Sequence, residues 1–182
     1  RESPRIDTRL EGTMYAAAID QGTTGTRFMV FDQAGRVVAA EYAEHQQIYP
    51  RPGWVEHDAI ESWQNTQQVT RATLEGAHIR AAEIAGIGIT NQRETALVWD
   101  RHTGQPLYNA IVWQCTRTLP LCQRLIDEGL EEVFRARTGL PIATYFSGPK
   151  VRWLLDNVSR VRAAVEAGDA LFGNMDTWLI WN

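Results

Sequence analysis

The chain has 182 residues, of which 44% are hydrophobic and 22% are charged, a balance that is typical of an ordered globular protein. Its formal net charge of −4, without any basic run, argues against a protein that binds nucleic acid or a membrane surface. No apolar stretch approaches the roughly 20 residues that a bilayer span requires, and no secretory leader pattern is present, so we expect a cytoplasmic protein.

The first thirteen residues, RESPRIDTRLEGT, mix both charges and show no hydrophobic period. Terminal segments of this kind are rarely ordered unless something ties them down. We therefore interpret residues 1–13 as a disordered leader or a cloning remnant, with Met14 as a candidate start. The predicted domain begins at residue 14.

Three short apolar runs follow, at residues 15–20, 27–32 and 36–43. Clusters of turn-forming residues separate them, which predicts three strands in an antiparallel meander. After a loop, residues 59–76 have a helical pattern, and Asp58 is well placed to be the N-cap of that helix.

The stretch at residues 83–90, EIAGIGIT, is a continuous apolar run of strand length. Such a run is typical of a strand that is buried on both faces. The pattern of residues 95–100 predicts another strand. Helical patterns dominate afterwards, around residues 121–128, 130–137, 150–157 and 161–167. This order of elements favours an α/β domain.

The turn between the first two strands, in DQGTTGTR, is rich in small and hydroxyl-bearing residues. Converging backbone N–H groups in such a turn can bind an anion, glycines allow a ligand to approach, and the hydroxyls of Thr23, Thr24 and Thr26 suit phosphate oxygens. Asp20 lies at the end of the preceding strand, where an ionised carboxylate is costly without a cation such as Mg²⁺. The alternative is a plain β-turn whose side chains bond their own backbone.

DQGTTGTR also resembles the first phosphate-binding motif of the actin, Hsp70 and sugar-kinase superfamily, which shares a ribonuclease-H-like fold with a mixed sheet flanked by helices. Further blocks resemble, in order, the glycerol kinases of the FGGY carbohydrate kinase family. These blocks are QIYPRPGWVEHDAIESW, GIGITNQRETALVWDRHTGQPLYNAIVWQ, TGLPIATYFSGPKVRWLLDN and DTWLIW. The resemblance implies that residues 14–182 form part of the N-terminal domain of a kinase that phosphorylates glycerol with ATP and Mg²⁺.

Roles for the phosphate side of the site follow from the resemblance where residues match. It implies that Asp20 is linked to magnesium, and that Thr23, Thr24 and Arg27 lie at the phosphates of ATP. The expected fold class, an α/β domain of the ribonuclease-H-like type, places these residues around the first turn.

For the glycerol side, the resemblance implies that Arg93 and Glu94 grip the hydroxyls, that Trp113 covers the carbons, and that Tyr145 gives a further contact. The chemistry is suitable, because a triol needs donors and acceptors side by side, and a tryptophan can cover its C–H faces. From the residues alone, an ordinary surface ion pair and a core tryptophan would be the usual interpretation.

Two residues depart from the family's motifs: Thr116 stands in WQCTRT where an arginine is usual, and Pro149 stands in YFSGPK where threonine is common.

The family's proton-accepting aspartate comes from a segment after residue 182, so we expect no catalytic base in this chain and no activity from it alone. Two alternatives stay open: a non-catalytic polyol- or phosphate-binding module, and a pentulose kinase. The sequence also leaves open whether the protein forms a homo-oligomer.

Overall fold

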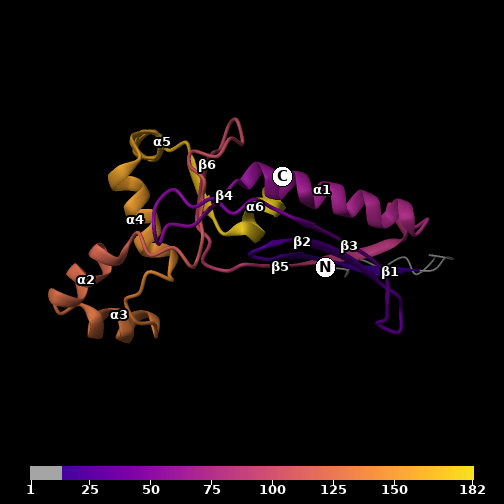
Figure 1. Cartoon of the computed structure of the whole chain (residues 1–182), viewed down its shortest axis with the longest axis horizontal. Helices are drawn as coiled ribbons and strands as arrows, with labels where there is room; N and C mark the ends of the chain where they lie inside the picture. Colours follow the sequence, from indigo (N-terminus) through magenta and orange to yellow (C-terminus); the bar gives the residue numbers. More distant parts are fainter. Residues whose placement is uncertain (1–13) are drawn as a thin grey trace, which may run out of the picture.

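The computed structural model describes residues 14–182, so the predicted leader lies outside the described residues. Its centre is a mixed four-stranded sheet in the order β3-β2-β1-β5 (Figure 1). Strands β1 (Tyr15–Gln21), β2 (Gly25–Phe31) and β3 (Val37–Glu44) are antiparallel neighbours, while β5 (Ile84–Asn91) runs parallel to β1. The predicted meander and the α/β class are both confirmed.

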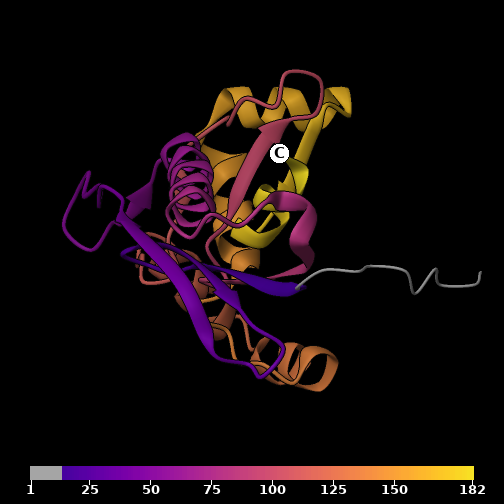
Figure 2. The same cartoon turned by 90° about the vertical axis from the view of Figure 1, so that its right-hand side faces the viewer.

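Helix α1 (Ala59–Gly76) lies along one face of this sheet (Figures 1 and 2). Side chains alternate along a strand, so every second residue of β1 and β2 points to the helix. Ala17, Ile19, Phe28 and Val30 are buried in this way and form one core with Val69 of α1. The alternation thus fixes which face of the sheet carries the core.

The first turn of α1 is capped by Asp58, as predicted. Its carboxylate accepts hydrogen bonds from the backbone N–H groups of Ile60 (2.8 Å) and Glu61 (3.4 Å), two donors that have no partner within the helix. Replacing Asp58 by alanine should lower the free energy of unfolding by about 1 kcal/mol, whereas asparagine should keep most of it. Urea midpoints of the two variants test this; equal losses would contradict a capping role.

Strand β5 occurs where it was predicted, but its predicted burial on both faces is wrong. Most of its residues are exposed, and Ile87 keeps 53% of its surface accessible. Within residues 14–182, β5 is an edge strand with β1 as its one neighbour in the sheet, and Gly86 and Gly88 give it little side chain to bury. An apolar run indicates a strand but does not say what covers it.

Most of the remaining elements form a second group at one end of the sheet, whereas α6 (Met175–Trp181) packs beside α1 and β5 (Figure 1). Two short antiparallel ladders join β4 (Glu56–His57) to β7 (Ala110–Ile111) and β6 (Leu97–Asp100) to β8 (Ala170–Gly173). The helices of this group are α2 (Leu119–Asp127), α3 (Glu131–Thr138), α4 (Ser147–Asn157) and α5 (Ser159–Ala167). A 3₁₀ turn, η1 (Ala81–Glu83), precedes β5.

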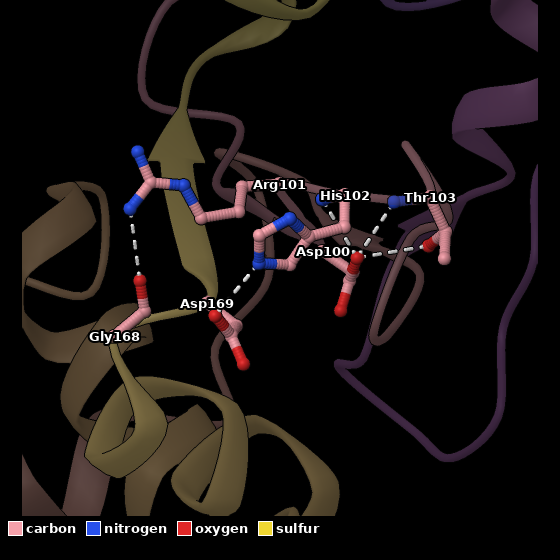
Figure 3. A network of polar contacts seen from close by, with 6 residues as sticks. All are labelled: Asp100, Arg101, His102, Thr103, Gly168 and Asp169. Carbon is pink, nitrogen blue, oxygen red and sulfur yellow. Dashed lines mark hydrogen bonds and ion pairs between the residues drawn. The ribbon is translucent and has the colours of Figure 1, made fainter.

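Two side-chain contacts hold these elements together. Trp178 of α6 is fully buried and donates from Nε1 to the carbonyl of Ala59 (2.8 Å), which joins α6 to the start of α1. At the other end of the β6–β8 ladder, His102, in the loop that follows β6, forms a hydrogen bond with Asp169, which precedes β8 (2.9 Å; Figure 3). Among the described residues, no helix is both long enough and apolar enough to cross a membrane.

Candidate active site

The candidate site lies where β1 and β5 end side by side. Because the two strands are parallel, their carboxyl ends meet at one edge of the sheet: Asp20 is opposite Thr90 and Gln21 is opposite Asn91. The backbone N–H of Gln92 continues the pairing by donating to the carbonyl of Gln21 (2.8 Å). This edge is where open α/β sheets usually bind ligands.

The turn after β1 is closed by a hydrogen bond from the Gly22 N–H to the Gly25 carbonyl (2.9 Å). Within residues 14–182, the backbone N–H groups of Thr23 and Thr24 have no acceptor, so both are available to an anion. Gly25 is required for a different reason than expected: a Cβ there would lie 2.4 Å from the carbonyl oxygen of Ala43 on β3. Packing of the neighbouring strand, not ligand access, therefore excludes a side chain at this position.

Asp20 and Arg27 face each other across β1 and β2. The half-buried carboxylate of Asp20 makes no hydrogen bond or ion pair with any residue from 14 to 182, and the guanidinium of Arg27 lies 5.3 Å from the Tyr42 ring centroid instead. A carboxylate without a partner at a ligand-binding edge fits a hydrated Mg²⁺, which binds proteins through few carboxylates. The plain-turn alternative is not supported, because Asp20 does not bond the backbone of the turn.

Thr26 does not belong to the site. Its side chain is fully buried on the helix-covered face of the sheet, and its hydroxyl has no hydrogen-bond partner in the described part of the chain. Position Thr26 pairs with the equally buried Gln21, so the strand alternation turns it away from the open face. Its predicted phosphate contact is wrong.

A buried polar network that the sequence did not reveal supports the turn from below. The amide nitrogen of Gln92, which carries two hydrogens, lies within hydrogen-bond distance of three acceptors: Nδ1 of His57 (3.1 Å), Oε1 of Gln21 (3.1 Å) and the Gly22 carbonyl (3.3 Å). His57 in turn donates from Nε2 to Gln47 (2.8 Å), and the amide of Gln47 donates to the Thr23 carbonyl (2.9 Å). Polar side chains at otherwise core-facing positions, such as Gln21, were the available signal.

The electrostatics of this network keep its histidines neutral. Burial, and to a smaller extent the repulsion between the His45 and His57 rings in their protonated forms, lowers the pKa of His57 to about 3. Burial also lowers the pKa of His45, whose Nε2 bonds the Thr23 carbonyl (2.9 Å). A neutral network can hold the turn without opposing an incoming cation.

Trp113 connects the turn to the second half of the predicted site. Its indole N–H donates to the hydroxyl of Thr23 (2.9 Å), and its ring meets Tyr145 edge to face, with centroids 5.9 Å apart. The structure therefore brings together three residues that were predicted to contact different parts of the ligands. The Thr23 hydroxyl keeps its own proton free to donate to a phosphate oxygen.

Glu94 occupies a strained position in the turn that follows β5. Its φ of +64° lies in the left-handed region, which is uncommon for residues other than glycine. Its N–H donates to the side chain of Asn174 (2.9 Å), and its Oε2 accepts from the N–H and the hydroxyl of Ser147 (2.7 and 2.6 Å). Within residues 14–182, Oε1 has no partner, so one carboxylate oxygen is held and the other remains available.

Arg93, like Asp20 and Arg27, makes no side-chain contact in the described part of the chain that joins it to the other predicted site residues. Its side chain is exposed and makes no hydrogen bond or ion pair among residues 14–182.

The two residues that depart from the family's motifs, Thr116 and Pro149, are accommodated by their immediate surroundings. Thr116 bonds the carbonyl of Gly53 through both its N–H (2.9 Å) and its hydroxyl (3.0 Å), and Pro149 lies in the first turn of α4, where a missing N–H costs no helical bond.

Comparison with known sequences gives a consistent result. A family model described as the N-terminal domain of the FGGY family of carbohydrate kinases matches residues 15–182. Among curated relatives, the glycerol kinase of Roseiflexus sp. (strain RS-1) is 59% identical over 168 residues, and that of Azorhizobium caulinodans is 60% identical over 170. These alignments cover 92% and 93% of the chain but 34% of each relative, so the chain spans about a third of their length.

Solved structures show the same fold. Glycerol kinase of Plasmodium falciparum, solved with ADP, is 35% identical, with a TM-score of 0.87 over 93% of this chain and 34% of that one. A gluconate kinase from Lactobacillus acidophilus is 20% identical, with a TM-score of 0.82 over 93% of this chain and 33% of the other, and shows the fold alone. The prediction of a sugar-kinase type of fold is confirmed.

Proposed function

Because the chain belongs to the FGGY family of carbohydrate kinases, we propose that the protein transfers the γ-phosphoryl group of ATP to glycerol and produces glycerol 3-phosphate and ADP. In this proposal residues 14–182 are part of its N-terminal domain. The observation that carries it is the arrangement of Glu94 and Trp113. An oriented carboxylate and an aromatic ring, both predicted for the triol, stand beside a turn with free N–H groups.

The glycerol side of the site would divide the triol between polar and apolar contacts. Oε1 of Glu94 would accept a hydrogen bond from a hydroxyl, and the exposed Arg93 would donate to one. The Trp113 and Tyr145 rings would cover the carbon chain and exclude water from it. Such a site selects against substrates that lack a hydroxyl, because its acceptor, once covered by the ligand, would stay unpaired.

The phosphate side would use the turn after β1. The N–H groups of Thr23 and Thr24 and the Thr23 hydroxyl would contact phosphate oxygens, while Arg27 would leave the Tyr42 ring for the nucleotide. Asp20 would hold Mg²⁺, directly or through its waters; a bound Mg²⁺ neutralises charge that develops on the transferring phosphoryl group. The protein's own part is then to position the acceptor hydroxyl in line with the phosphorus–oxygen bond that breaks.

The base that takes the hydroxyl proton is not assigned to any residue of this chain. In the proposal it belongs to a part of the protein outside the 182 residues, together with the adenosine site. Of the alternatives, a pentulose kinase would need contacts for a longer polyol. The 59–60% identity to proteins named glycerol kinase supports the shorter substrate.

The substrate assignment is tested with Glu94→Gln in the whole protein. Glutamine keeps one oxygen for Ser147 and presents an NH2 group, a donor, in place of Oε1. A substrate hydroxyl then loses its acceptor, which costs ~1–3 kcal/mol, so the KM for glycerol should rise about tenfold while the KM for ATP stays within about twofold. An ADP-release assay with each substrate varied separately measures both constants. Glu75→Gln on the exposed face of α1 is the matched control.

Two results would contradict the proposal. A wild-type protein that releases no ADP with glycerol, but does so with a pentulose, would assign the substrate to the alternative class. A Glu94→Gln variant with an unchanged KM for glycerol would remove Glu94 from the triol site.

A further inference from the structure

Lys150 is a fully buried lysine in α4, and no part of the proposed chemistry uses it. Its ammonium donates to the backbone carbonyl of Glu94 (2.9 Å) and, through a very short contact, to that of Tyr145, with a longer contact to that of Phe146 (3.5 Å). An ammonium has three donors and no acceptor, so all three can be used here. Burial of a lysine is unusual unless it is satisfied in this way.

The carbonyls that Lys150 contacts come from two separate parts of the site. Glu94 follows β5, whereas Tyr145 and Phe146 lead into α4. The backbone of Glu94 is strained, and such a conformation persists only where the surroundings hold it in place. The contact from Lys150 holds its carbonyl, as Asn174 holds its N–H.

We propose that Lys150 is a positioning residue that sets the affinity for glycerol by clamping the backbones of Glu94 and Tyr145 together. The inference rests on the function proposed above. Ser147 fixes the Glu94 carboxylate from the same helix, so α4 holds this residue at both backbone and side chain. Without the ammonium, three carbonyls would face each other without a donor, and we expect the two segments to separate.

The charge of Lys150 makes the clamp sensitive to alkaline pH. Burial lowers the pKa of its ammonium to about 8, against the opposing influence of Glu94, Cys115 and Cys122, which face it from the β5 end, the segment after β7 and α2. Above that pH the amine is neutral and keeps two donors for three carbonyls. Glycerol binding should therefore weaken as the pH rises through about 8.

The test replaces Lys150 by methionine, which fills similar space without a charge, in the whole protein. We expect the KM for glycerol to rise about tenfold with little change in the KM for ATP, since the clamp holds the triol side of the site. Arg152→Met is the matched control, because Arg152 lies on the same helix, is exposed and pairs only with Asp156 among the described residues. Equal increases in both Michaelis constants would indicate a general structural role and overturn the proposal.

A second measurement needs no variant. The glycerol dissociation constant of the wild-type protein, followed by calorimetry, should rise severalfold from about pH 7 to about pH 9.5, and Lys150→Arg, which stays charged, should flatten this rise. A constant that does not change with pH in the wild type would overturn the clamp. Failure of the proposed function would look different, because the wild-type protein would then bind no glycerol at any pH.

Discussion

Asp20→Asn in the whole protein is expected to lower kcat by about 10²–10³-fold, on the scale seen when one preorganised electrostatic partner is removed from a transition state. The carboxylate of Asp20 has no partner among residues 14–182, so its charge is available to a cation at the phosphates. Asparagine keeps the shape and removes that charge. The KM for glycerol should change by less than about threefold, because the triol is held by other residues.

The measurement is steady-state kinetics at several Mg²⁺ concentrations. A weakened metal site should require more Mg²⁺ for half-maximal rate in Asp20→Asn, whereas a merely distorted turn would not shift this requirement. Asp32→Asn is the control, since Asp32 is bound to Arg36 in the next turn and lies away from the site. If Asp20→Asn and Glu94→Gln changed the same constants to the same extent, the division between a phosphate side and a triol side would be wrong.

Local signals allowed much of the fold to be predicted. The meander followed from turn residues between apolar runs, and α1 begins and ends at the predicted residues, with Asp58 capping its first turn. The burial of individual elements was harder to predict from the sequence. The pattern at residues 83–90 correctly indicated a strand, yet β5 is exposed, because covering a strand depends on what packs against it and not on its own composition.

The site shows the same division between local and distant information. The sequence indicated Thr23, Glu94 and Trp113 separately, but the bond from Trp113 to Thr23 joins residues 90 positions apart. Lys150 was not singled out, because a lysine in a helical pattern is usually exposed. Its burial became visible only when α4 was placed against the turn that follows β5.

The largest expected effect on stability concerns His57. In the folded protein Nε2 of its ring donates to Gln47 and Nδ1 accepts from the amide of Gln92, so the neutral ring is the form that fits. A proton on Nδ1 would face the N–H of that amide. Gln92 cannot turn round without cost, because its carbonyl oxygen accepts from Thr95 (3.0 Å) and its nitrogen donates to Gln21 (3.1 Å).

The pH dependence follows from the difference between the two states. The unfolded chain takes up a proton at His57 near the ordinary pKa of 6.5, but the folded chain does so only near 3. The unfolded state therefore binds more protons in this window, and stability is lost as the pH falls from about 6.5 to about 3. At about 1.4 kcal/mol for each pKa unit, the loss from His57 approaches roughly 4–5 kcal/mol.

His57→Gln should therefore be less stable than the wild type near neutral pH, because it loses buried hydrogen bonds, but should lose less stability on acidification. Urea midpoints from about pH 7 to about pH 4 measure both effects, and the two curves should converge as the pH falls. His102→Gln is the control, because this histidine is exposed and bonds Asp169 at the surface (Figure 3).

His45 adds to the effect with the same sign, since burial also lowers its pKa, while the nearby Glu61 acts against this. Parallel curves for wild type and His57→Gln would show that His57 takes up its proton in the folded state at an ordinary pH, and the neutral network would be refuted.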